Sequence, residues 1–98
     1  MPRTKRPSDE LELIGRRLRA SRIALGLSTK DLVASIGVQS DTYSQWESGT
    51  RLLDVLAAAR ISKRHRITLE WLYRGYAFEM PGTLLKKYSR PNQSNFDL

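Results

Sequence analysis

Residues 26–49 decide the fold, and they read GLSTKDLVASIGVQSDTYSQWESG. The three glycines divide this stretch into two short units, because glycine readily takes the left-handed conformation that ends a helix. Ser28 can cap the first unit, whose apolar residues recur at helical spacing. In the second unit Tyr43 and Trp46 lie one helical turn apart. The stretch therefore predicts two short helices joined at Gly37, an arrangement typical of a helix-turn-helix.

The second predicted helix, 39–48, has two different faces. Helical geometry turns Tyr43 and Trp46 inward. The opposite face carries hydroxyl, carboxylate and amide groups, from Ser40, Asp41, Ser44, Gln45 and Ser48. Such groups match the donors and acceptors on base edges in the DNA major groove. We therefore expect this face to read base pairs.

Outside this stretch we predict three further helices, each beginning after a residue that can cap it. These helices cover 9–25, 55–64 and 69–74, with caps at Ser8, Asp54 and Thr68. No stretch alternates at period two for long enough to form a strand. The prediction is a compact all-α domain of five helices over 9–76. Residues 83–88 are compatible with a short sixth helix.

Composition limits the chemistry of the chain. Its 98 residues support one domain. With no cysteine and one histidine, the chain excludes disulfides, thiolates and most metal sites. We find no paired carboxylates, phosphate-binding glycine loop or histidine triad, and expect neither an enzyme, nor a metal site, nor a cofactor. With 17 Lys+Arg against 10 Asp+Glu, the net charge of +7 makes a polyanion the first partner to consider.

The two ends of the chain differ from the middle. Residues 1–8 form a basic arm that we interpret as flexible, and arms of this kind reach DNA grooves or phosphates. Its basic residues are Arg3, Lys5 and Arg6. We interpret residues 77–98 as a C-terminal extension and expect it to end in a frayed tail.

We also predict a homodimer, because one recognition helix covers too few base pairs for useful specificity. Apolar residues after Trp71 exceed what a small core needs. The predicted interface uses them: Leu72, Tyr73, Tyr76, Phe78, Leu84 and Leu85.

The sequence resembles the phage repressor/Cro family of helix-turn-helix proteins, also called the xenobiotic-response-element family. The resemblance runs from 14 to 72 without insertion or deletion. It rests on Ile14-Gly15, Leu18, Arg22, Gly26-Leu27-Ser28, Asp31-Leu32, Ile36-Gly37-Val38, Trp46-Glu47-Ser48-Gly49 and Ile67-Thr68-Leu69-Glu70-Trp71-Leu72.

The resemblance implies a repressor-like fold and a role for particular residues. Thr29, Thr50 and Arg51 take positions that contact DNA phosphate in the family. The base- and backbone-contacting face is implied for Gln39, Ser40, Asp41, Ser44 and Gln45. Arg22 and Glu47 occupy positions that form an internal ion pair in the family.

From these observations we expect a sequence-specific, double-stranded DNA-binding transcription regulator of the repressor type, acting in the cytoplasm of a prokaryote or encoded by a phage. The alternative is an antitoxin-like or adaptor module whose main partner is a protein. Asp41 favours the alternative, because a carboxylate facing DNA repels phosphate unless it accepts from cytosine. The longest apolar run, 55–59, is too short for a membrane span, and we expect no membrane partner. We interpret the basic residues Arg60, Lys63, Arg64 and Arg66 as solvated surface.

Overall fold

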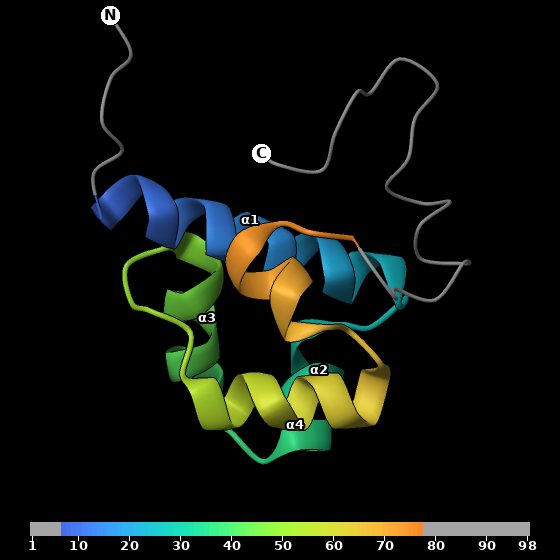
Figure 1. Cartoon of the computed structure of the whole chain (residues 1–98). Coiled ribbons are helices and arrows are strands. Elements are labelled where there is room, and N and C mark those ends of the chain that lie inside the picture. The colour runs from blue at the N-terminus through green and yellow to red at the C-terminus, as the bar shows by residue number, and fades with distance from the viewer. Residues whose placement is uncertain (1–6, 78–98) are drawn as a thin grey trace, which may run out of the picture.

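The structure, a computed structural model, describes residues 7–77, and these fold into five helices (Figure 1). In chain order they are α1 (Pro7–Ala24), α2 (Thr29–Ile36), α3 (Ser40–Ser48), α4 (Val55–His65) and η1 (Glu70–Arg74), the last a single π-helical turn. The described residues contain no strand. The prediction of a five-helix all-α domain is confirmed.

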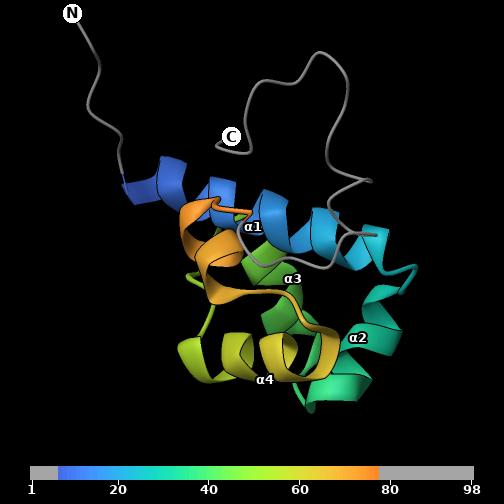
Figure 2. The ribbon, with the colours of Figure 1, turned by 45° about the vertical axis from the view of Figure 1, so that its right-hand side comes forward.

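The helices enclose one core. Figures 1 and 2 show α1 and α4 at opposite ends of the molecule, with α3 between them. α1 packs on α3 and η1, whereas α2 packs on α3 and α4. Every helix contributes buried apolar side chains, among them Leu18, Leu32, Tyr43, Trp46, Ile61, Trp71 and Leu72. Leu53 and Ile67, in the segments before and after α4, are also buried in the core.

Three of the shorter helical segments begin at the side-chain caps that the sequence predicts. In each, the cap oxygen accepts a backbone N–H three residues on: Ser28 from Asp31 at 3.0 Å, Asp54 from Ala57 at 3.0 Å and Thr68 from Trp71 at 3.1 Å. The predicted cap at Ser8 is wrong, because α1 begins at Pro7 and takes Ser8 into its first turn. Proline is favoured at that position because an N–H there would have no helical partner.

α1 crosses the C-terminal end of α3 at very close range, and two glycines make this possible. A Cβ atom at Gly15 would lie 2.6 Å from the Trp46 carbonyl oxygen. Gly49 has a φ of 78°, and a Cβ there would lie 2.8 Å from the Cα of Glu12. The position of α3 against α1 is therefore fixed by backbone contact.

Two polar side chains of α1 are buried and reach η1. Arg17, only 4% exposed, donates from Nη1 to the Leu72 carbonyl at 3.2 Å. Ser21 accepts a hydrogen bond of 2.9 Å from the indole N–H of Trp71, and its hydroxyl donates to the Arg17 carbonyl at 2.8 Å. These bonds join the first and last helices of the described domain.

The predicted dimer interface needs correction. Leu72 is fully buried in the core, so it cannot meet a second copy. Tyr73 is half-buried and its hydroxyl donates to the Leu53 carbonyl at 2.7 Å. Tyr76 is exposed, and the remaining predicted interface residues, Phe78, Leu84 and Leu85, lie outside the described residues with the helix expected over 83–88.

Candidate nucleic-acid interface

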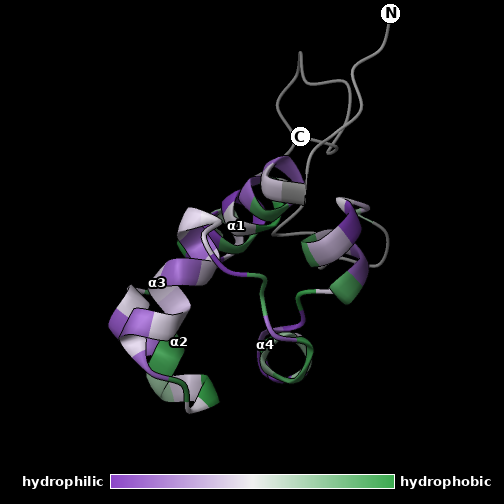
Figure 3. Ribbon diagram, turned by 90° about the vertical axis from the view of Figure 1, so that its left-hand side faces the viewer, coloured by the Kyte–Doolittle hydropathy of each residue, from purple (hydrophilic) through white to green (hydrophobic). Residues whose placement is uncertain are grey.

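α2 and α3 form the two helices of the predicted helix-turn-helix. Figure 3 shows them together on one side of the molecule, with α4 on the other side. Gly37 ends α2 in the left-handed conformation, and its N–H donates to the Val33 carbonyl. The turn is therefore built by local backbone bonds, as the sequence predicts.

α3 starts one residue later than predicted. Gln39 is its N-cap residue in an extended conformation, and the Gln39 side chain makes no capping bond. The helix proper begins at Ser40. Gln39 therefore belongs to the turn, and its side chain is exposed.

The two faces of α3 are sharply different. Tyr43 and Trp46 are 0% and 3% exposed, and their rings meet edge to face with centroids 6.0 Å apart. The outer face consists of exposed polar side chains at Ser40, Asp41, Ser44, Gln45 and Ser48. Two buried aromatic rings thus fix which face of α3 is presented to solvent.

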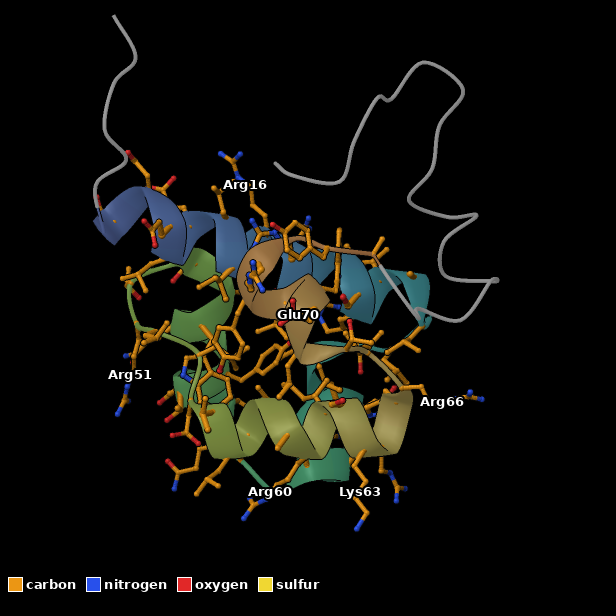
Figure 4. All side chains as sticks on the ribbon, in the orientation of Figure 1. Arg16, Arg51, Arg60, Lys63, Arg66 and Glu70 are labelled. Atoms are coloured by element: carbon orange, nitrogen blue, oxygen red, sulfur yellow. The ribbon has the colours of Figure 1, made fainter. Side chains whose placement is uncertain are left out.

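The segment after α3 folds back on the helix end. The backbone N–H groups of Thr50 and Arg51 both donate to the Gln45 carbonyl, at 3.1 and 3.2 Å. The Thr50 hydroxyl lies 3.0 Å from the Ser48 hydroxyl and also donates to the Gln45 carbonyl at 3.3 Å. A phosphate contact by the Thr50 hydroxyl would have to compete with these bonds. The Arg51 side chain is exposed and extends away from the domain (Figure 4).

Thr29 opens α2, beside exposed Lys30. The Ser28 hydroxyl caps this helix end by accepting from the Asp31 N–H at 3.0 Å. Thr29 is half-buried, so part of its side chain remains at the surface.

Arg22 and Glu47 form an ion pair behind α3. The Arg22 Nε lies 2.7 Å from Glu47 Oε2, and the two side chains are 14% and 13% exposed. Arg22 also donates from Nη1 to the Leu27 carbonyl at 3.0 Å. The hydrogen bond to Glu47 raises the pKa of Arg22. The pair joins α1, the α1–α2 turn and the end of α3.

The phenol of Tyr43 lies against this pair. Burial is the main cause that raises its pKa above the ordinary value of 10.0, and the nearby Glu47 carboxylate adds to the effect. Tyr43 is therefore a neutral core residue at neutral pH.

The electrostatics of α3 are unusual for a surface expected to meet DNA. The helix carries Asp41 and Glu47 and no basic residue. Glu47 is neutralised by Arg22. Asp41 sits in the first turn, where the positive end of the helix dipole stabilises a carboxylate, so its presence has a structural explanation without a base contact. Arg51 and Lys30 are the exposed cations at the margins of α3 and α2.

Some expected site residues are not placed. The basic arm with Arg3, Lys5 and Arg6 lies outside the described residues. Among residues 7–77, no group of three or more His, Cys, Asp and Glu side chains could hold a metal ion. No helix in that range is long and apolar enough to cross a membrane.

Comparison with known proteins gives one match. A protein-family model described as helix-turn-helix matches residues 18–72, which is more than half of the chain. No curated protein and no solved structure matches the chain significantly. The matched range contains α2, α3, their turn and both residues of the Arg22–Glu47 pair.

Proposed function

We propose a function from the premise that this chain belongs to the Cro/C1-type helix-turn-helix family of DNA-binding transcription regulators. The chain recognises a specific double-stranded DNA sequence and represses transcription by occupying it. α3 would enter the major groove, which is about 12 Å wide and admits one helix. Phosphate contacts at its margins would fix the register.

The single observation that carries this proposal is the separation of the faces of α3. Tyr43 and Trp46 are buried, so the helix cannot rotate about its axis without exposing two aromatic rings. The polar face is thereby held outward in a fixed orientation. A fixed row of hydroxyl and amide groups is what direct readout of base edges requires.

The residues divide into two roles under this proposal. Base readout is assigned to the outer face and its N-cap: Gln39, Ser40, Asp41, Ser44 and Gln45. Phosphate contact is assigned to Thr29, Thr50 and Arg51, with the arm residues Arg3, Lys5 and Arg6 as a further contact. Asp41 would accept from the amino group of cytosine.

We propose further that two copies bind together, so that two half-sites lie about one helical turn apart on DNA. With Leu72 buried, other apolar residues must supply the contact. Leu52, Val55 and Leu56 are 56%, 62% and 67% exposed and line one groove beside α3. Exposed apolar side chains gathered in one place are typical of an interface between proteins.

Selection of DNA from a random duplex library with the purified protein tests the proposal. We expect an enriched motif with two inverted half-sites, and two chains per duplex in sedimentation of the complex. Absence of any enriched motif would refute sequence-specific binding. A single unrepeated half-site with one chain per duplex would refute the dimer and leave base reading standing.

A further inference from the structure

α4 and the residue after it carry four exposed basic residues within seven positions. Between Val55 and Leu69 the sequence has no acidic residue. Its basic residues there are Arg60, Lys63, Arg64 and Arg66, all exposed, and we call these four the α4 basic face. Figure 4 shows Arg60 and Lys63 extending from the side of α4 that faces away from α1, and Arg66 extending beyond its end.

The outer face of α3 has no basic residue. Lys63 and Arg64 line a groove to which α3 contributes no residue, whereas Arg60 also lines the groove beside Gln39. The side chains of Lys63, Arg64 and Arg66 make no hydrogen bond or ion pair with other residues in the range 7–77. Three like charges held close together without a counter-charge repel one another. A polyanion would relieve that repulsion.

The backbone at Arg66 gives an independent reason to assign a function to this face. Arg66 has a φ of 63°, and it is the one residue other than glycine with a positive φ in the described chain. Left-handed residues elsewhere in residues 7–77 are all glycines. A side chain in this conformation is strained relative to glycine. The sequence therefore keeps an arginine at a position where glycine would be more stable, and such strain is typical of functional sites.

The geometry fits a row of phosphates. Arg60, Lys63 and Arg64 lie at positions i, i+3 and i+4, hence on one face of α4. From residue 60 to residue 64 the helix rises about 6 Å, which is close to two phosphate intervals, since the phosphates of one DNA strand recur about every 3.4 Å along the axis. Arg60 also donates to the Ile36 carbonyl at 3.4 Å, and with Lys63, Arg64 and Ser35 it lines a groove between α2 and α4.

We propose that the α4 basic face binds the phosphate backbone of nucleic acid, as a contact surface separate from the base-reading face of α3. Cations also stabilise the C-terminal end of a helix through its dipole, which accounts for Lys63 and Arg64 in the last turn. That effect does not account for Arg60 in the middle of α4, nor for arginine in place of glycine at 66.

The first test compares two double variants of the full chain that remove the same charge. Lys63→Gln/Arg64→Gln removes two cations of the α4 basic face, and Arg16→Gln/Arg19→Gln removes two exposed cations of α1. Binding to a labelled random-sequence duplex is measured by fluorescence anisotropy over a range of salt concentrations. We expect the α4 variant to lower the log–log salt slope by about two units and to bind the duplex more weakly at low salt. The α1 variant should match the parent.

Arg66→Gly gives the second test, because it should raise the melting temperature and lower the affinity for DNA. Glycine relieves the left-handed strain, so the melting temperature should rise by a few degrees, while affinity for the random duplex falls and the salt slope decreases by about one unit. Arg66→Lys should restore binding without the gain in melting temperature. A more stable Arg66→Gly protein with unchanged DNA binding would overturn the proposal.

Other outcomes separate this proposal from that of base reading. The ratio of affinity for a selected site over random DNA should be unchanged in the α4 variants, because phosphate contacts carry no sequence information. Equal salt slopes for the α4 and α1 variants would refute the α4 surface while leaving base reading by α3 intact. Binding of the same variants to polyglutamate, which stands in for an acidic protein, is measured in parallel. If the α4 variant loses polyglutamate binding while its DNA binding is unaltered, the proposal is refuted and the partner is an acidic protein.

Discussion

Arg22 on α1 and Glu47 on α3 form one hydrogen-bonded ion pair of 2.7 Å that is largely shielded from water. Removing either partner leaves the other charge partly buried and unpaired. We expect Arg22→Ala and Glu47→Ala each to lower the free energy of unfolding by about 2–3 kcal/mol, below the loss for a fully buried pair because some water reaches both groups. Urea unfolding followed by far-UV circular dichroism measures this.

The pair of Glu70 and Arg74 provides the matched control. It has a similar bond of 2.9 Å, but its side chains are 51% and 59% exposed. Glu70→Ala should therefore lower the free energy of unfolding by no more than about 0.5 kcal/mol. Equal losses for Glu47→Ala and Glu70→Ala would contradict the view that burial makes the first pair important.

The close approach of α1 to α3 predicts the effect of adding one methyl group. At Gly15 the methyl would meet the backbone of Trp46 and Glu47, which cannot move aside. Gly15→Ala should cost about 3 kcal/mol, at the upper end of the range for overpacking. Gly26→Ala is the control, because its Cβ would meet nothing within 4 Å and only the φ of 75° is unfavourable. Equal melting temperatures for Gly15→Ala and Gly26→Ala would argue against a tight crossing of α1 and α3.

Ser21 predicts a second, polar contribution to stability. Its hydroxyl is the partner of the buried Trp71 indole N–H. Ser21→Ala leaves that donor unsatisfied, and we expect a loss of about 1–3 kcal/mol in unfolding free energy. In a Trp71→Phe background, Ser21→Ala should cost less, since the donor is absent. A double-mutant cycle with zero coupling would be the contrary result.

His65 predicts a pH dependence of stability. Burial, followed by the charge of Arg64, lowers its pKa from the ordinary 6.5, so the imidazole is harder to protonate in the folded chain than in the unfolded one. Below about pH 6.5 the unfolded chain binds more protons than the folded one, so the free energy of unfolding decreases as the pH is lowered. As His65 is the one histidine of the chain, His65→Gln should flatten this dependence between about pH 7 and pH 5.5. Parallel curves for parent and variant would exclude His65 as the cause.

Base reading and phosphate contact can be told apart by two variants on a selected DNA site. Gln45 presents an amide that can bond adenine at two positions, so Gln45→Ala should cost about 1–3 kcal/mol there and relax preference at one base pair. Arg51→Ala should weaken all sequences alike and reduce the salt slope by about one unit. Uniform weakening by Gln45→Ala would instead assign that side chain to the DNA backbone.

The sequence predicts those parts of the fold that depend on near neighbours. The caps at Ser28, Asp54 and Thr68 act over three residues, and the inward turn of Tyr43 and Trp46 follows from helical periodicity alone. For this reason the helices and the outward face of α3 could be predicted. The burial of Leu72, which the sequence assigned to a dimer contact, could not be predicted, because whether an apolar residue fills a core depends on the whole packing.

Contacts between distant residues are what the sequence does not reveal. Arg17 looks like its exposed neighbours Arg16 and Arg19, and its burial depends on a carbonyl 55 residues away. The left-handed backbone at Arg66 could not be predicted either, because an arginine in a sequence does not indicate a positive φ. A polar residue on the apolar side of α1, such as Ser21, was the available signal that a buried hydrogen bond lies there.

The bonds from α1 to η1 bear on how the protein emerges from the ribosome. Synthesis delivers α1 first. Its inward side packs on α3 as well as on η1, so it is fully covered only when residues up to Leu72 are available to bond Arg17 and Ser21. Until then, part of the apolar side of the first helix stays exposed, which is the condition under which chains meet chaperones or aggregate. A message truncated before the codons for Trp71 and Leu72 would therefore yield a chain with α3 encoded in full but no closed domain to hold it.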